Sequence, residues 1–389
     1  MKSVIKAALI LIASLMGSQM GVFAYTDSAK VSLLTCSPGS ELYSKFGHSA
    51  IRVYDPYEGT DIVFNYGLFD FNTPNFYLKF IRGKLPYQLG IQRFYNFMWD
   101  YQSEGRKVVE TPLMLDLAAQ RKLLDFLEYN YRPENRQYPY DFFFDNCASR
   151  IRDVVEQSAG LTYIQKVQDG RERTFRQLLD EYIKKYEWID FGIDLILGLP
   201  ADQKADFRAE MFLPDYLASN LQAGRAGNLP VAGSPAILLE PLPEPKKMSL
   251  FPPPFVFFSL LLLGAALLTW KGSRRAQKGF DILYFGMLGL SGALFTFMWA
   301  GTDHDATHAN LNLLWANPFA FCVVAGAVFA GRAFWFRIVA GLTLVALLGF
   351  PFLPQQFHPA VIPLMLITLL RCGVYLSGQG LKFLSYPKN

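Results

Sequence analysis

The sequence predicts an α+β domain followed by an all-α transmembrane bundle of about five helices. Three observations support this class. Strand-like and helix-like patterns share the first half of the chain, a Pro- and Gly-rich segment begins at residue 224, and five apolar runs occupy the last third. The chain has 389 residues, which is enough for more than one domain of about 100–200 residues.

The first 24 residues have the pattern of a secretory signal peptide. Basic Lys2 and Lys6 precede an apolar core over 7–16, and Ala24 supplies a small residue near the expected cleavage site. Retention as an uncleaved membrane anchor is the alternative. The predicted division of the chain is a signal peptide over 1–24, an exported domain over 25–223, a linker over 224–252 and a transmembrane domain over 253–380.

The exported domain begins with a predicted β-hairpin. Residues Ser49–Tyr54 alternate in polarity, 55–59 supply turn residues, and Ile62–Tyr66 resumes a β-rich run. Helix patterns follow over Pro112–Tyr131, from Asn146 as N-cap through Val155, and over Thr174–Tyr186.

The transmembrane prediction depends on apolar runs and on the positions of basic residues. The runs are about Phe255–Trp270, Ile282–Ala300, Phe319–Ala330, Ile338–Leu353 and Val361–Tyr375. A span requires about 20 residues, so the third run is short. In a five-span arrangement the basic residues of the connections and tail all lie inside, namely Lys271, Arg274, Arg275, Lys278, Arg332, Arg337, Lys382 and Lys388. The N-terminal domain is then outside, as the signal peptide also predicts.

Charge and cysteine usage narrow the function classes. The net charge is +4 without a dense Lys/Arg run, which argues against nucleic acid as a partner. Cys322 and Cys372 fall in apolar runs and are expected to be small buried hydrophobes. Cys36 and Cys147 lie in the exported domain, where a disulfide between them is the alternative to catalysis.

Cys147 is the candidate nucleophile. It directly follows the predicted N-cap Asn146, so the first-turn N–H groups and the positive end of the helix dipole surround its sulfur. A free thiol has a pKa of about 8.5, and a helix N-terminus and a neighbouring histidine lower it. The same N–H groups are suited to stabilise the oxyanion of a tetrahedral intermediate.

His48, the one histidine of the exported domain, is the candidate base. It begins the first strand of the predicted hairpin. Folding the hairpin about Tyr57 and Glu58 sets Ala50 opposite Asn65, so Asn65 lies diagonal to His48 on the same face and is the candidate orienting residue. A register slip of one residue would place Asn65 on the other face.

The other three histidines lie in the outer loops of the predicted bundle. His304 and His308 are in the loop over 301–317, and His358 is in the loop over 354–359. His304 and His308, flanked by Asp303 and Asp305, have a spacing compatible with metal ligands. Binding of lipid head groups or of a substrate amine is the favoured role, and a structural role is the other alternative.

Four segments resemble the periplasmic domain of Lnb-type bacterial lipoprotein N-acyltransferases. They are Cys36–Gly39, Phe46–Arg52, Phe64–Phe71 and Phe144–Ala148. The membrane half resembles the same family through His304, His308, Asn310, Asn312, Leu313, Leu314 and Pro318. The order of His-bearing strand and Asn-Cys helix is also similar to permuted papain-like enzymes of the NlpC type. Some of those relatives use a second histidine as orienter, and this domain has none.

The resemblance implies a cysteine-dependent acyltransferase of a bacterial inner membrane, with its catalytic domain in the periplasm. Cys147 would take an acyl chain from a phospholipid and pass it, as a thioester, to the N-terminal amine of a diacylglyceryl-cysteine lipoprotein. His304, His308, Asn310 and Asn312 are the expected substrate-binding residues. No cofactor or metal is expected, and the expected partners are phospholipid, diacylated lipoproteins and the bilayer. The alternatives are a membrane-anchored cysteine amidase or peptidase acting on cell-wall peptides, and a non-catalytic envelope scaffold.

Overall fold

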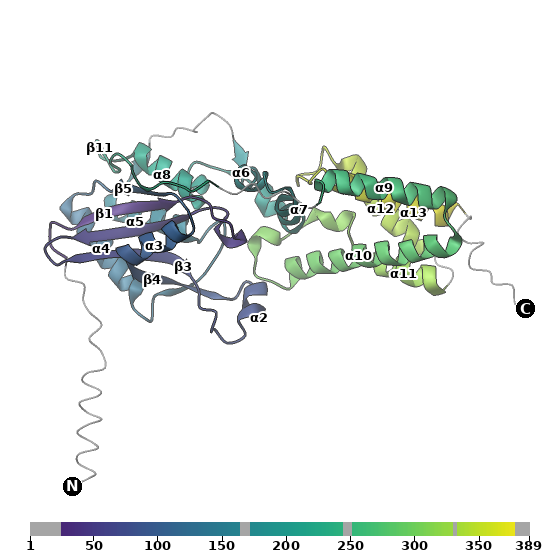
Figure 1. Ribbon diagram of the computed structural model, residues 1–389, viewed down its shortest axis with the longest axis horizontal. Helices are drawn as coiled ribbons and strands as arrows, with labels where there is room; N and C mark the ends of the chain where they lie inside the picture. Colours follow the sequence, from purple (N-terminus) through teal and green to yellow (C-terminus); the bar gives the residue numbers. More distant parts are fainter. Residues whose placement is uncertain (1–24, 164–171, 244–250, 330–332, 378–389) are drawn as a thin grey trace, which may run out of the picture.

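The computed structural model describes residues 25–163, 172–243, 251–329 and 333–377. The predicted signal peptide, 1–24, lies outside the described residues. Figure 1 shows two parts along the long axis, a domain that contains a β-sheet and a bundle of helices. A mixed α/β region followed by a helical region is therefore confirmed.

The centre of the N-terminal domain is a seven-stranded antiparallel sheet in the order β12-β5-β1-β2-β3-β4-β6. Along the chain its strands are β1 (Lys30–Cys36), β2 (His48–Asp55), β3 (Thr60–Leu68), β4 (Pro86–Arg93), β5 (Val108–Pro112), β6 (Gln137–Pro139) and β12 (Ala236–Leu239). β2 and β3 form the predicted hairpin. Ile51 pairs with Phe64, and the same register sets Ala50 opposite Asn65, as expected from the sequence.

Helices accompany this sheet in the N-terminal domain. They are α2 (Phe76–Ile81), α3 (Phe94–Ser103), α4 (Leu117–Tyr131), α5 (Cys147–Ala159), α6 (Phe175–Ile183), α7 (Glu187–Ile196) and α8 (Pro214–Ala223). α4 begins at Leu117 and not at Pro112, because 108–112 is a strand and the Asp116 carboxylate accepts the Ala119 N–H at 2.8 Å as N-cap. α6 begins after its N-cap Thr174, close to the predicted start.

The two faces of the sheet are covered by different helices. On one face, Leu33 and Ile51 belong to a core that includes Leu127 of α4 and Ile151 of α5. On the other face, Leu34, Ala50 and Val63 pack in a smaller core with Phe97 of α3. Because successive strand residues point to opposite faces, burial on both sides holds β1 and β2 rigidly. His48, the first residue of β2, is therefore held on a well-packed strand.

The predicted linker over 224–252 is partly a folded segment. It contributes β10 (Gly224–Ala226) and β11 (Leu229–Pro230), which form a small sheet with β7 (Thr162–Tyr163), and β12, which pairs with β5. Val231 is fully buried. The Pro and Gly residues led us to expect a surface connection, but the short apolar stretches between them extend the sheet. Residues 244–250 lie outside the described residues.

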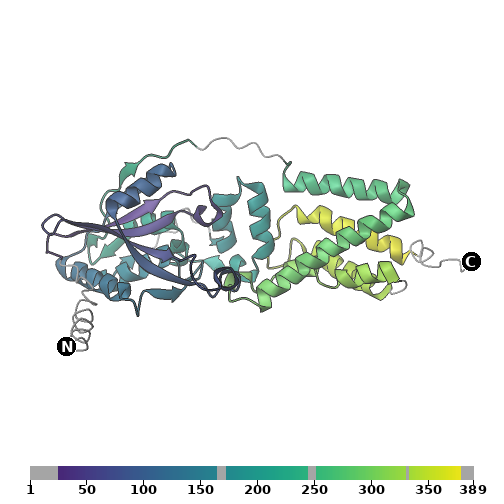
Figure 2. The same ribbon diagram turned by 60° about the horizontal axis from the view of Figure 1, so that its bottom comes forward.

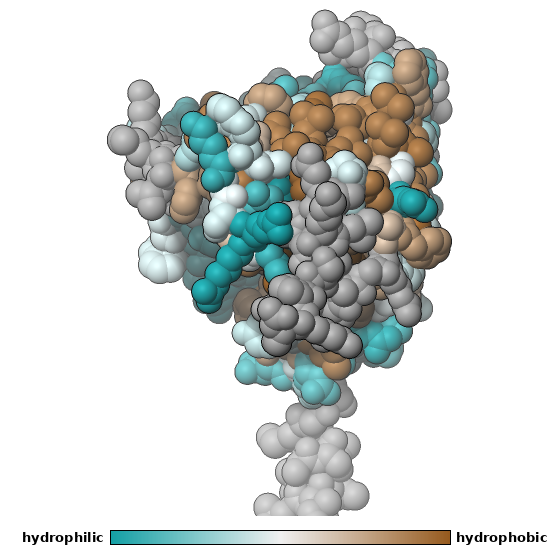
Figure 3. All heavy atoms as spheres, turned by 90° about the vertical axis from the view of Figure 1, so that its right-hand side faces the viewer, coloured by the Kyte–Doolittle hydropathy of each residue, from teal (hydrophilic) through white to brown (hydrophobic). Residues whose placement is uncertain are grey.

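Five helices of the described residues form the bundle: α9 (Pro254–Lys271), α10 (Arg274–Ala300), α11 (Ala320–Phe329), α12 (Ala333–Gly349) and α13 (Val361–Leu376). By length and composition, α9 and α10 are long and apolar enough to cross a membrane, whereas α12 and α13 are shorter apolar helices. Side chains exposed on α9 and α10 are largely apolar. Figure 3 shows hydrophobic residues over a broad area at the end of the molecule remote from the sheet.

The outer loops of the bundle dock on the C-terminus of α7. A helix end leaves carbonyl groups without intrahelical partners. Here Asn310 Nδ2 donates to the Leu195 carbonyl at 2.8 Å, Asn312 Nδ2 donates to the same oxygen at 3.2 Å, and Gln355 Nε2 donates to the Leu197 carbonyl at 3.3 Å. All three amide side chains are buried. The two parts of the protein are therefore joined by a buried hydrogen-bond network.

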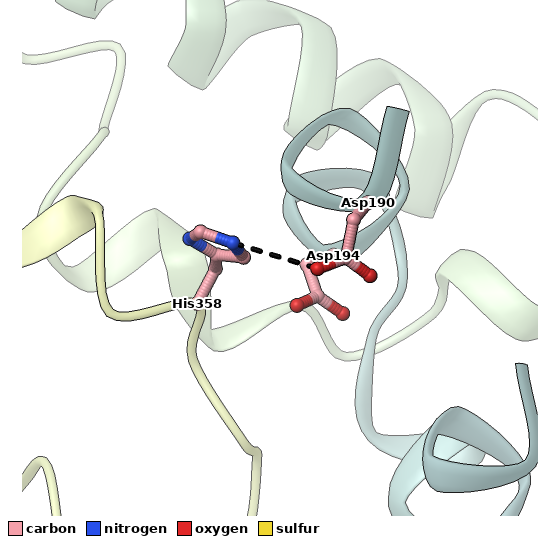
Figure 4. Close-up of side chains that lie close together, drawn as sticks. All are labelled: Asp190, Asp194 and His358. Carbon is pink, nitrogen blue, oxygen red and sulfur yellow. Dashed lines mark ion pairs between the residues drawn. The ribbon is translucent and has the colours of Figure 1, made fainter. Parts of the chain in front are cut away.

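An acidic cluster extends this junction (Figure 4). His358 Nε2 lies 3.6 Å from Asp190 Oδ2, and the edge of its ring packs on Phe191. Asp194, one turn further along α7, forms a buried ion pair with Arg176 at 2.7 Å. In the described part of the chain, Asp190, Asp194 and His358 are the one group of three side chains with ligand atoms close enough to hold a metal ion.

Gly198 is expected to be essential for this junction. Its N–H donates to the Ala306 carbonyl at 2.9 Å, and a Cβ there would overlap the His308 carbonyl. Backbone atoms cannot swing away as a side chain does, so Gly198→Ala should separate the loop from α7. We expect a clearly lower unfolding temperature in detergent, read by intrinsic fluorescence.

The matched control is Gly192→Ala, because a Cβ at this helical glycine has nothing within 4 Å. It should leave the unfolding temperature unchanged or raise it, since alanine favours helix over glycine by about 1 kcal/mol. Equal unfolding temperatures for the two variants would show that the Gly198 contact does not hold the parts together.

Candidate active site

Cys147 occupies the first position of α5, as its sequence context predicts. Asn146 is the N-cap: its Oδ1 accepts the N–H groups of Ala148 and Ser149, each at 2.9 Å. Ser149 Oγ accepts the Asn146 N–H at 2.8 Å and completes a capping box. Asn146 Nδ2 also donates to the Phe212 carbonyl at 2.8 Å. The first turn of α5, which carries the thiol, is therefore held both by its own cap and by the Phe212 carbonyl.

His48 and Asn65 are in contact. His48 Nε2 lies 3.2 Å from Asn65 Oδ1 across the hairpin. An amide oxygen accepts only, so Nε2 carries the proton and Nδ1 keeps the lone pair that a base needs. Gly47, just before His48, has φ +80°, and a Cβ there would lie 2.7 Å from the Cys36 carbonyl oxygen. Glycine at 47 therefore lets β2 start close beside the end of β1.

The thiol and the histidine strand lie against each other. The backbone N–H of Ser49, one residue after His48, lies near the Cys147 sulfur and favours the thiolate, as do the N–H groups of Ala148 and Cys147 itself. Gly67 on β3 has φ +88°, and a Cβ there would be 3.7 Å from the Cys147 Cβ. The sheet and the start of α5 thus bring together Cys147, His48 and Asn65, which are distant in the sequence.

Burial, and not the helix dipole, determines the direction in which the pKa of the resting Cys147 thiol is shifted. Burial raises the pKa of Cys147, and the three N–H donors only partly oppose this. The expectation of a lowered thiol pKa is therefore wrong. Burial also lowers the pKa of His48 to about 4; the Asn65 hydrogen bond opposes this shift, and the positive charge of Arg106 adds to it. At neutral pH the pair is a neutral thiol beside a neutral imidazole.

A pH profile is expected to reflect the depressed His48 pKa. A base works only when unprotonated, so kcat/KM should stay high as the pH falls and decline only near pH 4, far below the pKa of about 6.5 of an ordinary histidine. The free energy of unfolding is expected to change with pH in the same direction, falling as the pH falls. His48 is neutral in the folded chain, so its contribution is complete above about pH 6.5 and is lost as the pH falls toward 4. A kinetic limb at pH 6–7 would contradict a His48 base with a depressed pKa.

The three residues line a cavity of about 720 Å³ that extends to the bundle. Its wall includes aromatic side chains from the sheet domain, among them Phe69, Tyr87 and Tyr140. Asp303, His304, Asp305 and Ala306 of the outer loop form another part of the wall. A volume of this size holds a drug-sized ligand. The cavity is thus shared between the sheet domain and the bundle.

The four residues of the outer loop that were expected to bind substrate do not all lie at the cavity. His304 lines the cavity, and its Nε2 donates to the Phe80 carbonyl at 3.1 Å. His308 is not in the cavity wall; its Nδ1 lies 3.7 Å from Asp305 Oδ1. Asn310 and Asn312 are buried, and their amides are occupied by the carbonyls of α7. For these two, the structure corrects the expected substrate contact to a docking role.

The two cysteines of this domain are both free thiols. Cys36 is the last residue of β1, pairs with His48 across the strands, and is fully buried. Burial raises its pKa to about 12, so it is not a nucleophile at neutral pH. The disulfide alternative has no support in the structure.

Sequence reasoning missed Arg106 and Tyr140. Arg106 is buried in the cavity wall, where Nε donates to the Ser37 carbonyl at 2.8 Å and its charge disfavours protonation of His48. Tyr140 lies beside Gly67 and stacks on Tyr87 at 4.3 Å. No pattern in the sequence marks either residue, because both reach the site through long-range packing.

Two family models match this chain. Residues 23–181 match the Lnb N-terminal periplasmic domain, and residues 245–379 match the Lnb transmembrane domain. The chain belongs to the Lnb family, and the resemblance inferred from its motifs is confirmed. It is a membrane protein with a periplasmic part. No curated protein and no solved structure matches it significantly.

Proposed function

We propose that this protein is a lipoprotein N-acyltransferase that uses Cys147 as nucleophile, His48 as base and Asn65 as orienting residue. The observation that carries the proposal is the shared cavity. It holds all three residues at one end of the sheet and has the outer loop of a transmembrane domain as part of its wall. The strand-borne histidine that precedes a helix-borne cysteine also supports a permuted papain-like fold.

The first half-reaction transfers an acyl chain to the enzyme. The Cys147 thiol gives its proton to His48 Nδ1 as its sulfur attacks the ester carbonyl of a phospholipid. The backbone N–H groups of Ser49 and Cys147, both near the sulfur, support stabilisation of the oxyanion. The intermediate collapses, the S–C bond stays, and the ester C–O bond breaks. His48 returns the proton to the leaving oxygen, which departs as a lysophospholipid.

The second half-reaction transfers the chain to the acceptor. The N-terminal amine of a diacylglyceryl-cysteine lipoprotein attacks the thioester carbonyl and loses a proton to His48. An amide bond forms, the C–S bond breaks, and the thiolate takes the proton from His48. The products are a triacylated lipoprotein and the resting neutral pair, so no cofactor is required.

The bundle keeps the active site close to its two lipid substrates. Both substrates are lipids confined to the plane of the bilayer, so a cavity at the membrane face converts a search in solution into an encounter in two dimensions. Five spans in an inner membrane, with the sheet domain in the periplasm, are the topology we propose. The buried docking at α7 holds the thiol at a fixed position relative to the outer loop.

Mass spectrometry of lipoprotein N-termini tests this function. Cells that contain the protein as their sole N-acyltransferase should yield triacylated N-termini, and cells without it diacylated ones. Unchanged diacylated N-termini in the presence of the protein, together with cleavage of cell-wall peptides by the purified protein, would favour an amidase instead.

A further inference from the structure

Helix α2 exposes apolar side chains to its surroundings. Of its six residues, only Phe76 is buried, whereas Tyr77, Leu78, Phe80 and Ile81 are exposed. Exposure of apolar surface to water costs about 25 cal/mol per Å². A six-residue helix is also too short to be stable alone. The surface of α2 is therefore suited to an apolar environment outside the protein.

The position of α2 indicates what that environment is. The Arg82 carbonyl accepts the Asp303 N–H at 2.9 Å, and the Phe80 carbonyl accepts His304 Nε2. Gly83 has φ +69°, and a Cβ there would lie 3.1 Å from the Asp303 backbone, so this close approach favours glycine. Asp303 follows the end of α10 by three residues, and α2 lies beside that end of α10 (Figures 1 and 2). The C-terminal end of α2 is thus tied to the outer end of a membrane-length helix.

A tryptophan marks the same level on α10. Trp299 is the penultimate residue of α10 and is exposed. Tryptophan and tyrosine are enriched where the bilayer meets water, because their rings are apolar with one polar edge. Tyr77 and Trp299 therefore lie in two segments that are joined at the end of α10. Lys79 on α2 and Arg82 after it provide positive charge for anionic head groups, whereas Lys84 Nζ lies 3.5 Å from Asp303 Oδ2 and is paired.

Aromatic rings connect α2 with the nucleophile. Phe76 packs on Phe71 and Phe69, Phe69 packs on Tyr87 at 5.4 Å, and Tyr87 stacks on Tyr140. Phe69, Phe71, Tyr87 and Tyr140 all line the cavity, as do Phe80 and Cys147. An apolar wall therefore extends from the base of α2 to the thiol.

We propose that α2 is a membrane-interface helix, inserted into the periplasmic leaflet through Tyr77, Leu78 and Ile81, and that it forms the rim over which a phospholipid acyl chain enters the cavity. Insertion of α2 is independent of the reaction. The role of α2 as an access route rests on the proposed acyl transfer. The occupant of this surface is the lipid bilayer itself.

Photocrosslinking in bilayers tests the insertion. The full chain carries p-benzoylphenylalanine in place of either Tyr77 or Tyr57 and is reconstituted in nanodiscs of phosphatidylethanolamine and phosphatidylglycerol. Both tyrosines are 77% exposed, but Tyr57 lies in the β2–β3 turn, beyond the end of β2 that is opposite His48, and the eight residues of β2 span about 23 Å. Illumination should produce lipid adducts at position 77 and none at position 57.

The result does not depend on catalysis, so the same adducts should form in a Cys147→Ala background. Lipid adducts absent from position 77, or equal at both positions, would overturn the insertion. Adducts of position 77 with a lipoprotein and not with lipid would show that α2 docks a protein, which also overturns it.

Kinetics test the access route. Tyr77→Ser, Leu78→Ser and Ile81→Ser together should raise the apparent KM for bilayer phospholipid about tenfold while kcat is retained, because they weaken the lipid contact and leave the reacting groups in place. Tyr57→Ser is the matched control and should change neither constant. Unchanged KM in the α2 variant would refute the access route. Absence of acyl transfer in the unmodified protein would instead refute the proposed function, with the crosslinking result unaffected.

Discussion

Replacement of Cys147 by alanine is expected to abolish lipoprotein N-acylation, with a loss on the order of 10⁴-fold or more, as for removal of other enzymic nucleophiles. Cys147→Ser should be nearly as inactive, because a hydroxyl beside a weakly basic imidazole is a poorer nucleophile than a thiol. The Cys147 side chain makes no contact on which the helix depends, since Asn146 and Ser149 form the cap. The variant should therefore fold and insert normally, and triacylated lipoprotein is the quantity to measure.

Cys36→Ser is the matched control for this experiment. Cys36 is also a free thiol of the same domain and lies at the end of β1 opposite His48, but it is fully buried with a pKa of about 12. This variant should keep substantial activity. Wild-type activity in Cys147→Ala, or loss of activity in Cys36→Ser with Cys147→Ala active, would reject Cys147 as the nucleophile.

Replacement of His48 by alanine should have the second largest effect. A resting thiol with a raised pKa depends on its base for the proton, so His48→Ala should lose about 10²–10⁴-fold or more in kcat. Addition of His48→Ala to Cys147→Ala should cost nothing further, because residues that act as one unit are not additive. The measurement is the single-turnover rate of acyl transfer to a synthetic diacylated lipopeptide.

Asn65→Ala serves as the graded comparison for His48. Asn65 Oδ1 holds His48 Nε2–H at 3.2 Å and raises the pKa of His48, so its loss should lower the rate less than loss of His48 and shift the acid limb to lower pH. If Asn65→Ala were as active as wild type with an unchanged pH profile, Asn65 would not be the orienting residue.

Local patterns were sufficient to predict much of this site. The two-residue periodicity of strands and the position of the turn predicted that Ala50 lies opposite Asn65, and the His48–Asn65 contact follows from that register. The N-cap preference of asparagine predicted the start of α5 and thus the position of Cys147. Both predictions depend only on residues close together in the chain.

The sequence did not predict features that depend on burial and long-range contact. The thiol pKa is raised and not lowered, because the first turn of α5 packs against the sheet, where Ala148 and Ser149 are buried and Cys147 is half-buried. Asn310 and Asn312 cap α7, which we did not predict as a helix, so the sequence left their amides free for a substrate. Arg106 and Tyr140 reach the cavity from separate elements of the fold, β5 and β6 being their nearest strands in the chain.

The central step of the proposed reaction is an acyl chain held on Cys147 as a thioester between donor and acceptor. The most direct test incubates the purified full chain with phospholipid in the absence of lipoprotein and analyses its peptides by mass spectrometry. We expect an acyl adduct on the peptide that contains Cys147, sensitive to hydroxylamine, discharged by a diacylated lipopeptide, and absent from Cys147→Ala. Triacylated lipopeptide formed by the Cys147→Ala protein, or an acyl group found on another residue of a competent enzyme, would contradict a Cys147 thioester.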